Sequence, residues 1–153
     1  MSAQGKTNAI RILESLGVTF DVATYAVGDE HVDAVTAARE MGVEPDIVFK
    51  TLVAHDEKNG ILVFCVPGPA ELDLKKAARA AGVRKVDLVS LRDLTPLTGY
   101  VRGGCSPIGM KKRFPTWIDE MAGAYPRIYV NAGARGMQVL IAPADLLAAT
   151  GAS

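Results

Sequence analysis

The chain has 153 residues, of which 49% are hydrophobic and 22% charged, a composition typical of a globular protein with one core. Seventeen basic residues balance seventeen acidic ones, so a nucleic-acid partner would have to be held by a local patch rather than by net charge. The N-terminus lacks the apolar segment of a secretory signal, no apolar run approaches about 18 residues, and the two cysteines stand in unrelated contexts. These features predict a soluble cytoplasmic protein with no disulfide framework, no zinc site and no membrane partner.

Periodicity and end signals predict short helices and strands along the first half of the chain. A first helix ends at Gly17, a strand covers 18–25, and a second helix covers roughly 32–41. The segment EPDIVFKTLVAH (44–55) is expected to give the next strand, through about residue 55, and the turn signal DEKNG follows it. The apolar segment ILVFCVP (61–67) is expected to return as a strand that is buried on both faces.

Short helices and strands are also expected along the second half of the chain. A helix is expected in ELDLKKAARAAGV (71–83), a short strand in RKVDLVS (84–90), and a brief helix after Ser90. Strands are expected in PTWIDEMAG (115–123), RIYVNAG (127–133) and GMQVLIAP (136–143), and the segment 143–151 closes with a helix. Many short strands interrupted by helices predict one α+β domain over residues 1–153, with a mixed sheet or barrel.

Common catalytic motifs are absent: the sequence has no Ser-His-Asp context, HExxH, Walker loop or GxGxxG. His31 and His55 are isolated, and capping or solvent-exposed roles are the favoured interpretation of both. Lys50 lies among apolar residues in IVFKTLVAH. It is either a lysine at a sheet edge that extends to solvent, or a cation that points into a pocket and binds a phosphate or an ester carbonyl.

The segment GGCSPIG (103–109) combines two glycines with a proline. Such a loop forms either a tight turn or a cluster of backbone amides that binds an anion or oxyanion. Six cationic residues form either solvated faces or a surface that follows phosphates: Lys75, Lys76, Arg79, Lys111, Lys112 and Arg113. Cys105 is a weak candidate for a nucleophile, and a small apolar filler is the favoured interpretation.

Five segments together resemble the YbaK/EbsC family, the free-standing relatives of the editing domain of prolyl-tRNA synthetase. They are FKTL (49–52), LDLKKAARAAGVRKV (72–86), TGYVRGGCSPIGMKKRFPTWID (98–119), IYVNAGARG (128–136) and IAPADL (141–146). The resemblance implies a largely antiparallel, barrel-like sheet surrounded by helices, and removal of a wrong amino acid from tRNA without metal or organic cofactor. Mischarged tRNA, above all Cys-tRNA(Pro), is the implied substrate, and prolyl-tRNA synthetase a possible partner.

The resemblance also implies site residues. The family's essential lysine matches Lys50, and the residues that would bind the aminoacyl-adenosine end are Tyr25, Thr51, Gly103, Gly104, Cys105, Ser106, Pro107, Asn131 and Gly133. In the family mechanism for cysteine, the substrate's own thiol attacks the ester carbonyl, so the protein supplies no nucleophile. For alanine-type substrates a positioned water would be needed instead.

Some positions depart from the family pattern: AVGDEHVDAV (26–35) follows the tyrosine, Cys105 replaces a common isoleucine, Asn131 a small serine, and Gln138 stands where a relative can carry aspartate. These departures concern the identity of the amino acid that is removed. The alternative from another class is a tRNA-acceptor or synthetase-associated binding module that keeps the fold without catalysis. A thiol enzyme based on Cys105 is a third interpretation.

Overall fold

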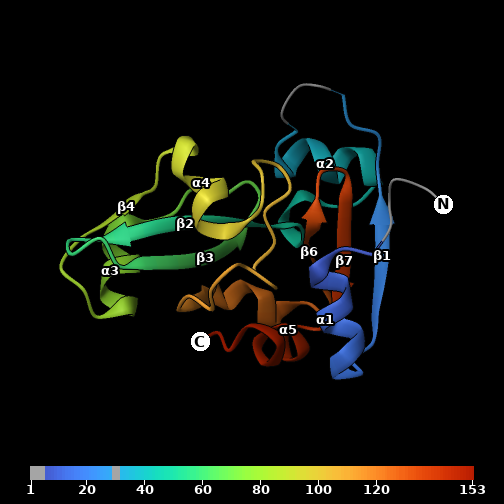
Figure 1. Ribbon diagram of the computed structural model, residues 1–153. Coiled ribbons are helices and arrows are strands. Elements are labelled where there is room, and N and C mark those ends of the chain that lie inside the picture. Colours follow the sequence, from blue (N-terminus) through green and yellow to red (C-terminus); the bar gives the residue numbers. More distant parts are fainter. Residues whose placement is uncertain (1–5, 29–31) are drawn as a thin grey trace.

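The computed structural model describes residues 6–28 and 32–153 (Figure 1). The sequence expectation for His31 lies outside these residues. Their elements are, in chain order, α1 (Asn8–Leu16), β1 (Phe20–Thr24), α2 (Ala34–Met41), the 3-10 turn η1 (Pro45–Ile47), β2 (Phe49–Asp56), β3 (Ile61–Pro67), α3 (Leu74–Ala81), β4 (Val86–Leu88), α4 (Leu91–Thr98), β5 (Thr116–Ile118), the 3-10 turn η2 (Glu120–Ala124), β6 (Ile128–Ala134), β7 (Met137–Ile141) and α5 (Pro143–Thr150).

The strands form two sheets. One has the order β1-β7-β6 and is antiparallel throughout; the other has the order β4-β2-β3-β5, with only the β3–β5 pair parallel. A parallel bridge between Val48 and Tyr129 joins the sheets where β2 begins. Figure 1 shows them side by side, with α1 and α5 beside the first sheet and α4 over β2. The expected mixed α+β fold is confirmed.

Local sequence signals explain many of the element ends. Thr7, Asp33 and Asp73 each accept a hydrogen bond from a backbone amide in the first turn of the following helix. In the β2–β3 hairpin, Asn59 takes a left-handed conformation at φ 61°, and Asp56 Oδ1 accepts from the amides of Lys58 and Gly60. Strong local signals therefore fix both the hairpin and the helix starts.

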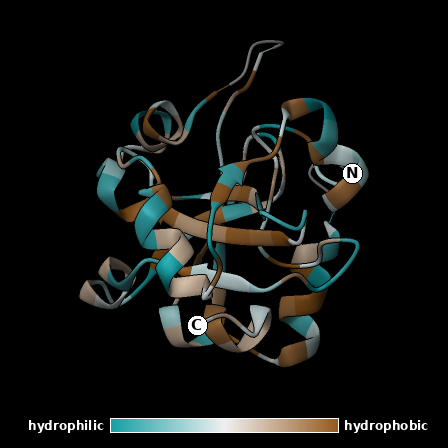
Figure 2. Ribbon diagram, turned by 90° about the vertical axis from the view of Figure 1, so that its left-hand side faces the viewer, coloured by the Kyte–Doolittle hydropathy of each residue, from teal (hydrophilic) through white to brown (hydrophobic). Residues whose placement is uncertain are grey.

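The hydrophobic core has two main parts, one under each sheet. The larger part joins α1 and α5 to the β1-β7-β6 sheet, with Leu13, Ile128, Val139 and Leu146 fully buried. The smaller part packs Ala77 and Ala78 of α3 against β2 and β3. Figure 2 shows hydrophobic residues along the central strands, whereas the surrounding helices alternate with hydrophilic ones. The five central residues of β3 are buried, as the apolar run 61–67 predicts.

The expected strand over 115–123 is too long. Only Thr116–Ile118 pairs with β3, because the Asp119 side chain accepts from the amide of Met121 and starts the turn η2. The expected strand through residue 55 likewise begins only at Phe49, after η1, where Pro45 starts the turn. In the part of the chain that the structure describes, no helix is long and apolar enough to cross a membrane.

Candidate functional site

A pocket of about 400 Å³ lies between the two sheets, within the range of about 300–1,000 Å³ usual for small-molecule sites. Five segments line it: the N-terminal end of α2, Val48 with the first five residues of β2, the residues around the start of α4, the loop after α4 through Arg102, Gly103 and Cys105, and the β6–β7 hairpin through Asn131 and Gln138. Tyr25 completes the lining. Six of the residues expected from the sequence thus meet here: Tyr25, Lys50, Thr51, Gly103, Cys105 and Asn131.

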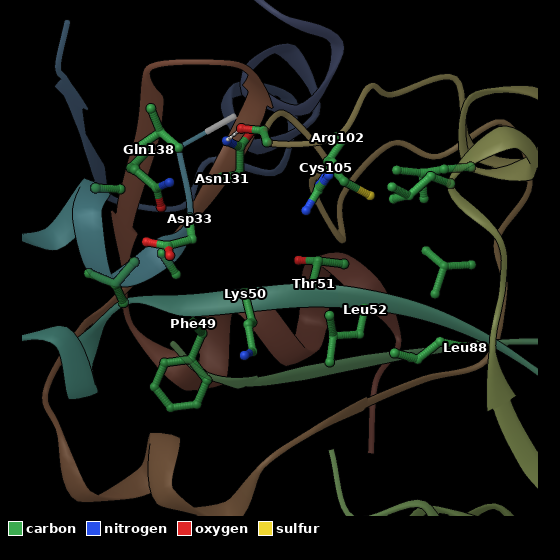
Figure 3. A pocket seen from close by; sticks show the side chains of 18 of the residues that line it. Asp33, Phe49, Lys50, Thr51, Leu52, Leu88, Arg102, Cys105, Asn131 and Gln138 are labelled. Carbon is green, nitrogen blue, oxygen red and sulfur yellow. Dashed lines mark hydrogen bonds between the residues drawn. The ribbon is translucent and has the colours of Figure 1, made fainter. Parts of the chain in front are cut away.

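Lys50 and Thr51 are neighbours on β2, a strand with β3 on one side and β4 on the other. At Lys50 itself, β2 pairs with Val66 of β3, whereas β4 pairs only with Ala54–Asp56 further along the strand. The half-buried Lys50 side chain lines the pocket. Figure 3 shows Thr51 pointing toward Arg102 and Cys105, whereas the Lys50 ammonium leaves β2 in another direction. The lysine and the glycine loop thus share a pocket but face different parts of it.

Arg102 brings a second cation to the pocket. Its side chain extends into the cavity beside Cys105 in Figure 3. Across residues 6–28 and 32–153, neither Arg102 nor Lys50 forms an ion pair. With Asp33 as the one carboxylate in the described lining, the two cations leave an excess of positive charge, which favours an anion such as a phosphate.

The loop at 103–109 owes its shape to packing and internal hydrogen bonds. The Gly104 amide donates to Val101 O at 2.9 Å, and Ser106 Oγ, fully buried, accepts from the amide of Ile108. A Cβ at Gly104 would lie 2.9 Å from the backbone nitrogen of Arg135, so only glycine fits there. Gly104, Ser106 and Pro107 do not line the pocket, and Pro107 faces a second cavity of about 220 Å³.

Asn131 connects this loop to the first sheet. Its Nδ2 donates to Gly103 O at 2.9 Å, and its Oδ1 accepts from the amides of Gly133 and Ala134 at 2.6 and 3.1 Å. Gly133 has φ 98° in the irregular part of the β6–β7 pairing, and it lies outside the pocket. Gly103 takes φ 82°. Among the described residues, no hydrogen bond uses the amides of Gly103 and Cys105, and both residues line the pocket.

The opposite wall carries three polar side chains. Tyr25 follows β1, and its hydroxyl accepts from Gln138 Nε2 at 3.4 Å. Asp33 lines the pocket from the start of α2, where its Oδ1 accepts from the amide of Thr36. The wall near α2 and β7 is therefore rich in hydrogen-bond acceptors, whereas cations occupy β2 and the loop.

The cysteines do not offer a nucleophile. Burial raises the pKa of Cys105 to about 12, and burial likewise raises the pKa of Cys65 to about 12. Both thiols are therefore protonated near neutral pH, and a thiol is a far weaker nucleophile than a thiolate. His55 Nδ1 lies 3.0 Å from Asp56 O at the hairpin, away from the pocket. In the described ranges, no three His, Cys, Asp or Glu side chains are grouped as metal ligands.

The cationic residues that the sequence predicts to contact phosphates lie outside the pocket, in two separate segments of the chain. Lys75 and Lys76 are exposed on α3. In the loop after α4, Lys111 Nζ donates to Pro96 O at 3.2 Å, and Arg113 donates to the carbonyls of Thr150 and Ala149 at the end of α5. Lys112 is exposed beside Arg113 at the second cavity. Their role as a phosphate-binding surface stays a prediction.

Sequence reasoning did not include Arg102, Asp33 and Gln138 among the site residues. Arg102 directly precedes the glycine pair within TGYVRGG, so its place in that motif could have indicated it. Gln138 was noticed only as a departure from a family pattern. Asp33 lies in the segment that departs most from that pattern, and no sequence signal marks it as part of a pocket.

Comparison with known proteins identifies the class of protein to which the chain belongs. Residues 29–149 match the family model of the aminoacyl-tRNA editing domain, and the chain belongs to this family of deacylases that act on aminoacyl-tRNA. The resemblance seen in the sequence is confirmed.

Three particular proteins are similar to the chain. The first is EbsC of Enterococcus faecalis (strain ATCC 700802 / V583), whose name gives it as a candidate Cys-tRNA(Pro)/Cys-tRNA(Cys) deacylase. EbsC is 48% identical to this chain over 147 residues, which cover 96% of this chain and 90% of EbsC. A solved structure described as a candidate trans-editing enzyme for prolyl-tRNA synthetase is 30% identical, with a TM-score of 0.81 and 98% and 96% coverage of the two chains. The structure of the hypothetical protein APE2540, at 22% identity, a TM-score of 0.84 and 96% and 98% coverage, shares the fold.

Proposed function

We propose that this chain is a trans-editing deacylase that removes cysteine from mischarged Cys-tRNA(Pro) in the cytoplasm. The observation that carries the proposal is the composition of the pocket. Its described lining includes two cations that form no ion pair and two loop residues whose amides form no hydrogen bond, and it includes no histidine or thiolate. The name of the similar EbsC protein supports cysteine as the amino acid. Such a pocket can position and polarise an ester, but it brings no nucleophile of its own.

In the proposed reaction, the 3′-terminal nucleotide enters between the sheets. Lys50 binds the terminal nucleotide or its phosphate, and Arg102 adds a second positive charge. The amides of Gly103 and Cys105 donate to the ester carbonyl oxygen and stabilise the negative charge that develops there. Tyr25, Thr51 and Asn131 shape the space for a small acyl group.

The nucleophile is the thiol of the substrate cysteine. Its sulfur forms a bond to the ester carbonyl carbon, the bond between that carbon and the ribose 3′ oxygen breaks, and the thiol proton passes to the departing oxygen. The products are a cyclic thiolactone and tRNA with a free 3′ hydroxyl. The step is therefore that of a thiolactone-forming lyase, and hydrolysis of the thiolactone gives the net result of a hydrolase. Holding the thiol near the carbonyl supplies the acceleration.

The rest of the tRNA is bound outside the pocket. Lys75, Lys76, Lys111, Lys112 and Arg113 are the proposed phosphate contacts, and prolyl-tRNA synthetase is the proposed source of the mischarged tRNA. The hydrogen bonds of Gly104, Ser106 and Gly133 support a positioning role for these three residues, because they hold the loop and the hairpin beside it, and the residues do not line the pocket.

The direct test is deacylation by the purified Lys50→Ala variant. Because the anchoring charge is removed, the single-turnover rate on Cys-tRNA(Pro) is expected to fall about 100-fold or more. Lys58→Ala, at the exposed hairpin turn away from the pocket, is the matched control and is expected to keep the parent rate. An unchanged rate in Lys50→Ala would remove Lys50 from the mechanism. Tight binding of tRNA by the parent protein without turnover would instead establish a non-catalytic binding module.

A further inference from the structure

The main chain of β2 turns its hydrogen-bonding groups alternately to its two edges, because successive residues of an antiparallel strand do so. The Asp56 amide donates to Gly60 O in the hairpin with β3, at 2.9 Å. On the opposite edge, Val53 O accepts from the Val89 amide at 3.0 Å. The main-chain groups of the even-numbered residues of β2 therefore face β3, and those of the odd-numbered residues, including Thr51, face away from it.

In the part of the chain that the structure describes, no strand covers that second edge at Thr51. β4 pairs with Ala54–Asp56, and the bond to Val53 O is the one nearest to Thr51 on that side. In the other direction, β6 meets β2 through the bridge at Val48. Within the described ranges, no bond outside the strand ladders uses the Thr51 amide or carbonyl, and Thr51 lines the pocket. One N–H donor and one C=O acceptor are thus left to be satisfied by a ligand or water.

The length of this gap limits what can pair with it. β4 closes one end at Val53 and the bridge to β6 closes the other at Val48, so a peptide strand of the usual length of about 5–6 residues does not fit. A single esterified amino acid does match, because its α-ammonium group is a donor and its carbonyl oxygen an acceptor. Figure 3 shows the Thr51 side chain pointing toward Arg102 and Cys105, so Thr51 lies next to the loop whose amides are the proposed contacts of that carbonyl.

We propose that the aminoacyl group of the substrate pairs with β2 as one residue of an added strand. The Thr51 carbonyl oxygen accepts from the α-ammonium group, and the Thr51 amide donates to the ester carbonyl oxygen. This inference rests on the proposed function and adds to it a main-chain contact at each end of the amino acid. Because the carbonyl oxygen gains negative charge during attack, the Thr51 amide supplements the loop amides rather than replacing them.

Amide hydrogen exchange, followed by NMR on the parent protein, tests this pairing without any substitution. The probe is 3′-amino-3′-deoxyadenosine acylated with cysteine, in which an amide bond replaces the labile ester. Saturation with this probe is expected to slow the exchange of the Thr51 amide at least about tenfold, because a bonded amide exchanges only when its bond opens. The Leu52 amide, which faces β3 opposite Phe64, is the internal control and is expected to exchange equally slowly with and without the probe.

A second probe isolates the contact with the Thr51 carbonyl. It carries 3-mercaptopropionic acid in place of cysteine and differs only in lacking the α-amino group. Calorimetric titration is expected to show at least about tenfold weaker binding of this probe to the parent protein, because the charge-assisted hydrogen bond from the ammonium group is lost.

Two substitutions at one position isolate the contact with the Thr51 amide. Thr51→Val and Thr51→Pro both remove the hydroxyl, but only proline removes the amide hydrogen, and a strand tolerates proline where its N–H faces away from the neighbouring strand. Thr51→Pro is expected to bind the cysteinyl probe at least about tenfold more weakly than Thr51→Val does.

Val22→Pro is the control for proline in an edge strand. The Tyr25 amide donates to Gly136 O, so by the same alternation the Val22 amide of β1 faces away from β7. Val22 lies outside the pocket, and this variant is expected to keep the parent affinity for the cysteinyl probe. Urea denaturation checks that the proline variants are folded. If Thr51→Pro does not fold, the exchange of the Thr51 amide in the parent protein decides alone.

Unchanged exchange of the Thr51 amide at saturation would overturn the inference. So would equal affinity of the two probes, equal affinity of Thr51→Pro and Thr51→Val, or binding of neither probe. Deacylation of Cys-tRNA(Pro), measured in parallel, separates this inference from the proposed function. Turnover without protection of the Thr51 amide refutes the strand pairing alone, whereas protection without turnover refutes the proposed catalysis alone.

Discussion

The Cys105 thiol lines the pocket, is only 8% exposed, and has its pKa raised from 9.0 to about 12 by burial. A raised thiol pKa means that the neutral form persists as pH rises, so Cys105 does not ionise over the usual assay range of about pH 6 to 9. Cys105 should therefore add no ionisation to the rate profile, whereas the substrate thiol, with an unperturbed pKa of about 8.5, should add one.

The pH dependence of deacylation tests this view of Cys105. The rate on Cys-tRNA(Pro) is expected to rise with pH toward the pKa of the substrate thiol, with the same profile in the parent protein and in Cys105→Ser. Single-turnover rates at several pH values measure it. Loss of the rising limb in Cys105→Ser would show that the protein's own thiol is the nucleophile.

The 103–109 loop depends on two contacts with the β6–β7 hairpin: the hydrogen bond from Asn131 to Gly103, and the close packing of Gly104 on Arg135. A substitution that separates loop from hairpin should therefore damage the pocket, although neither contact touches the reacting atoms.

Gly104→Ala tests this dependence. The added Cβ would lie 2.9 Å from the Arg135 backbone nitrogen, so the loop must shift, at an expected cost of about 1–3 kcal/mol in the free energy of unfolding. The deacylation rate should fall with it. Gly123→Ala, where no atom lies within 4 Å of the new Cβ, is the control and is expected to keep both quantities. Urea denaturation and single-turnover assays measure them, and parent-like behaviour of Gly104→Ala would mean that the loop tolerates displacement.

Local sequence signals predicted many of the elements, because glycine stops, capping side chains and alternating patterns act within a few residues. The β2–β3 hairpin and the helix caps are examples. The strand expected over 115–123 was too long because the cap formed by Asp119 prevailed over an apolar pattern. Placing Lys50 and Gly103 in one site required the resemblance to a family, and placing Asp33 and Gln138 in the lining of the pocket required coordinates. Their chemistry depends on where a side chain points in space.

The arrangement of the whole chain explains why the pocket exists at all. Lys50 and Thr51 belong to one sheet, and Asn131 and Gln138 to the other. The bridge between Val48 and Tyr129 brings the two sheets together beside the pocket (Figure 1). Neither sheet alone carries both the cations and the acceptors, so the site is a property of the complete fold. In the proposed reaction, a substrate held across both sheets has its acyl group confined next to the loop amides.

In the proposed reaction, the pocket confines the substrate but supplies no nucleophile, so the substrate must supply the nucleophile itself. The most direct test compares single-turnover deacylation of Cys-tRNA(Pro) and Ser-tRNA(Pro), because the two acyl groups differ only in sulfur and oxygen. We expect the cysteinyl ester to be cleaved about 100-fold faster or more, since at neutral pH a hydroxyl is a much weaker nucleophile than a thiol. Equal rates would contradict attack by the substrate thiol, because they would require a water or a protein group to attack both esters.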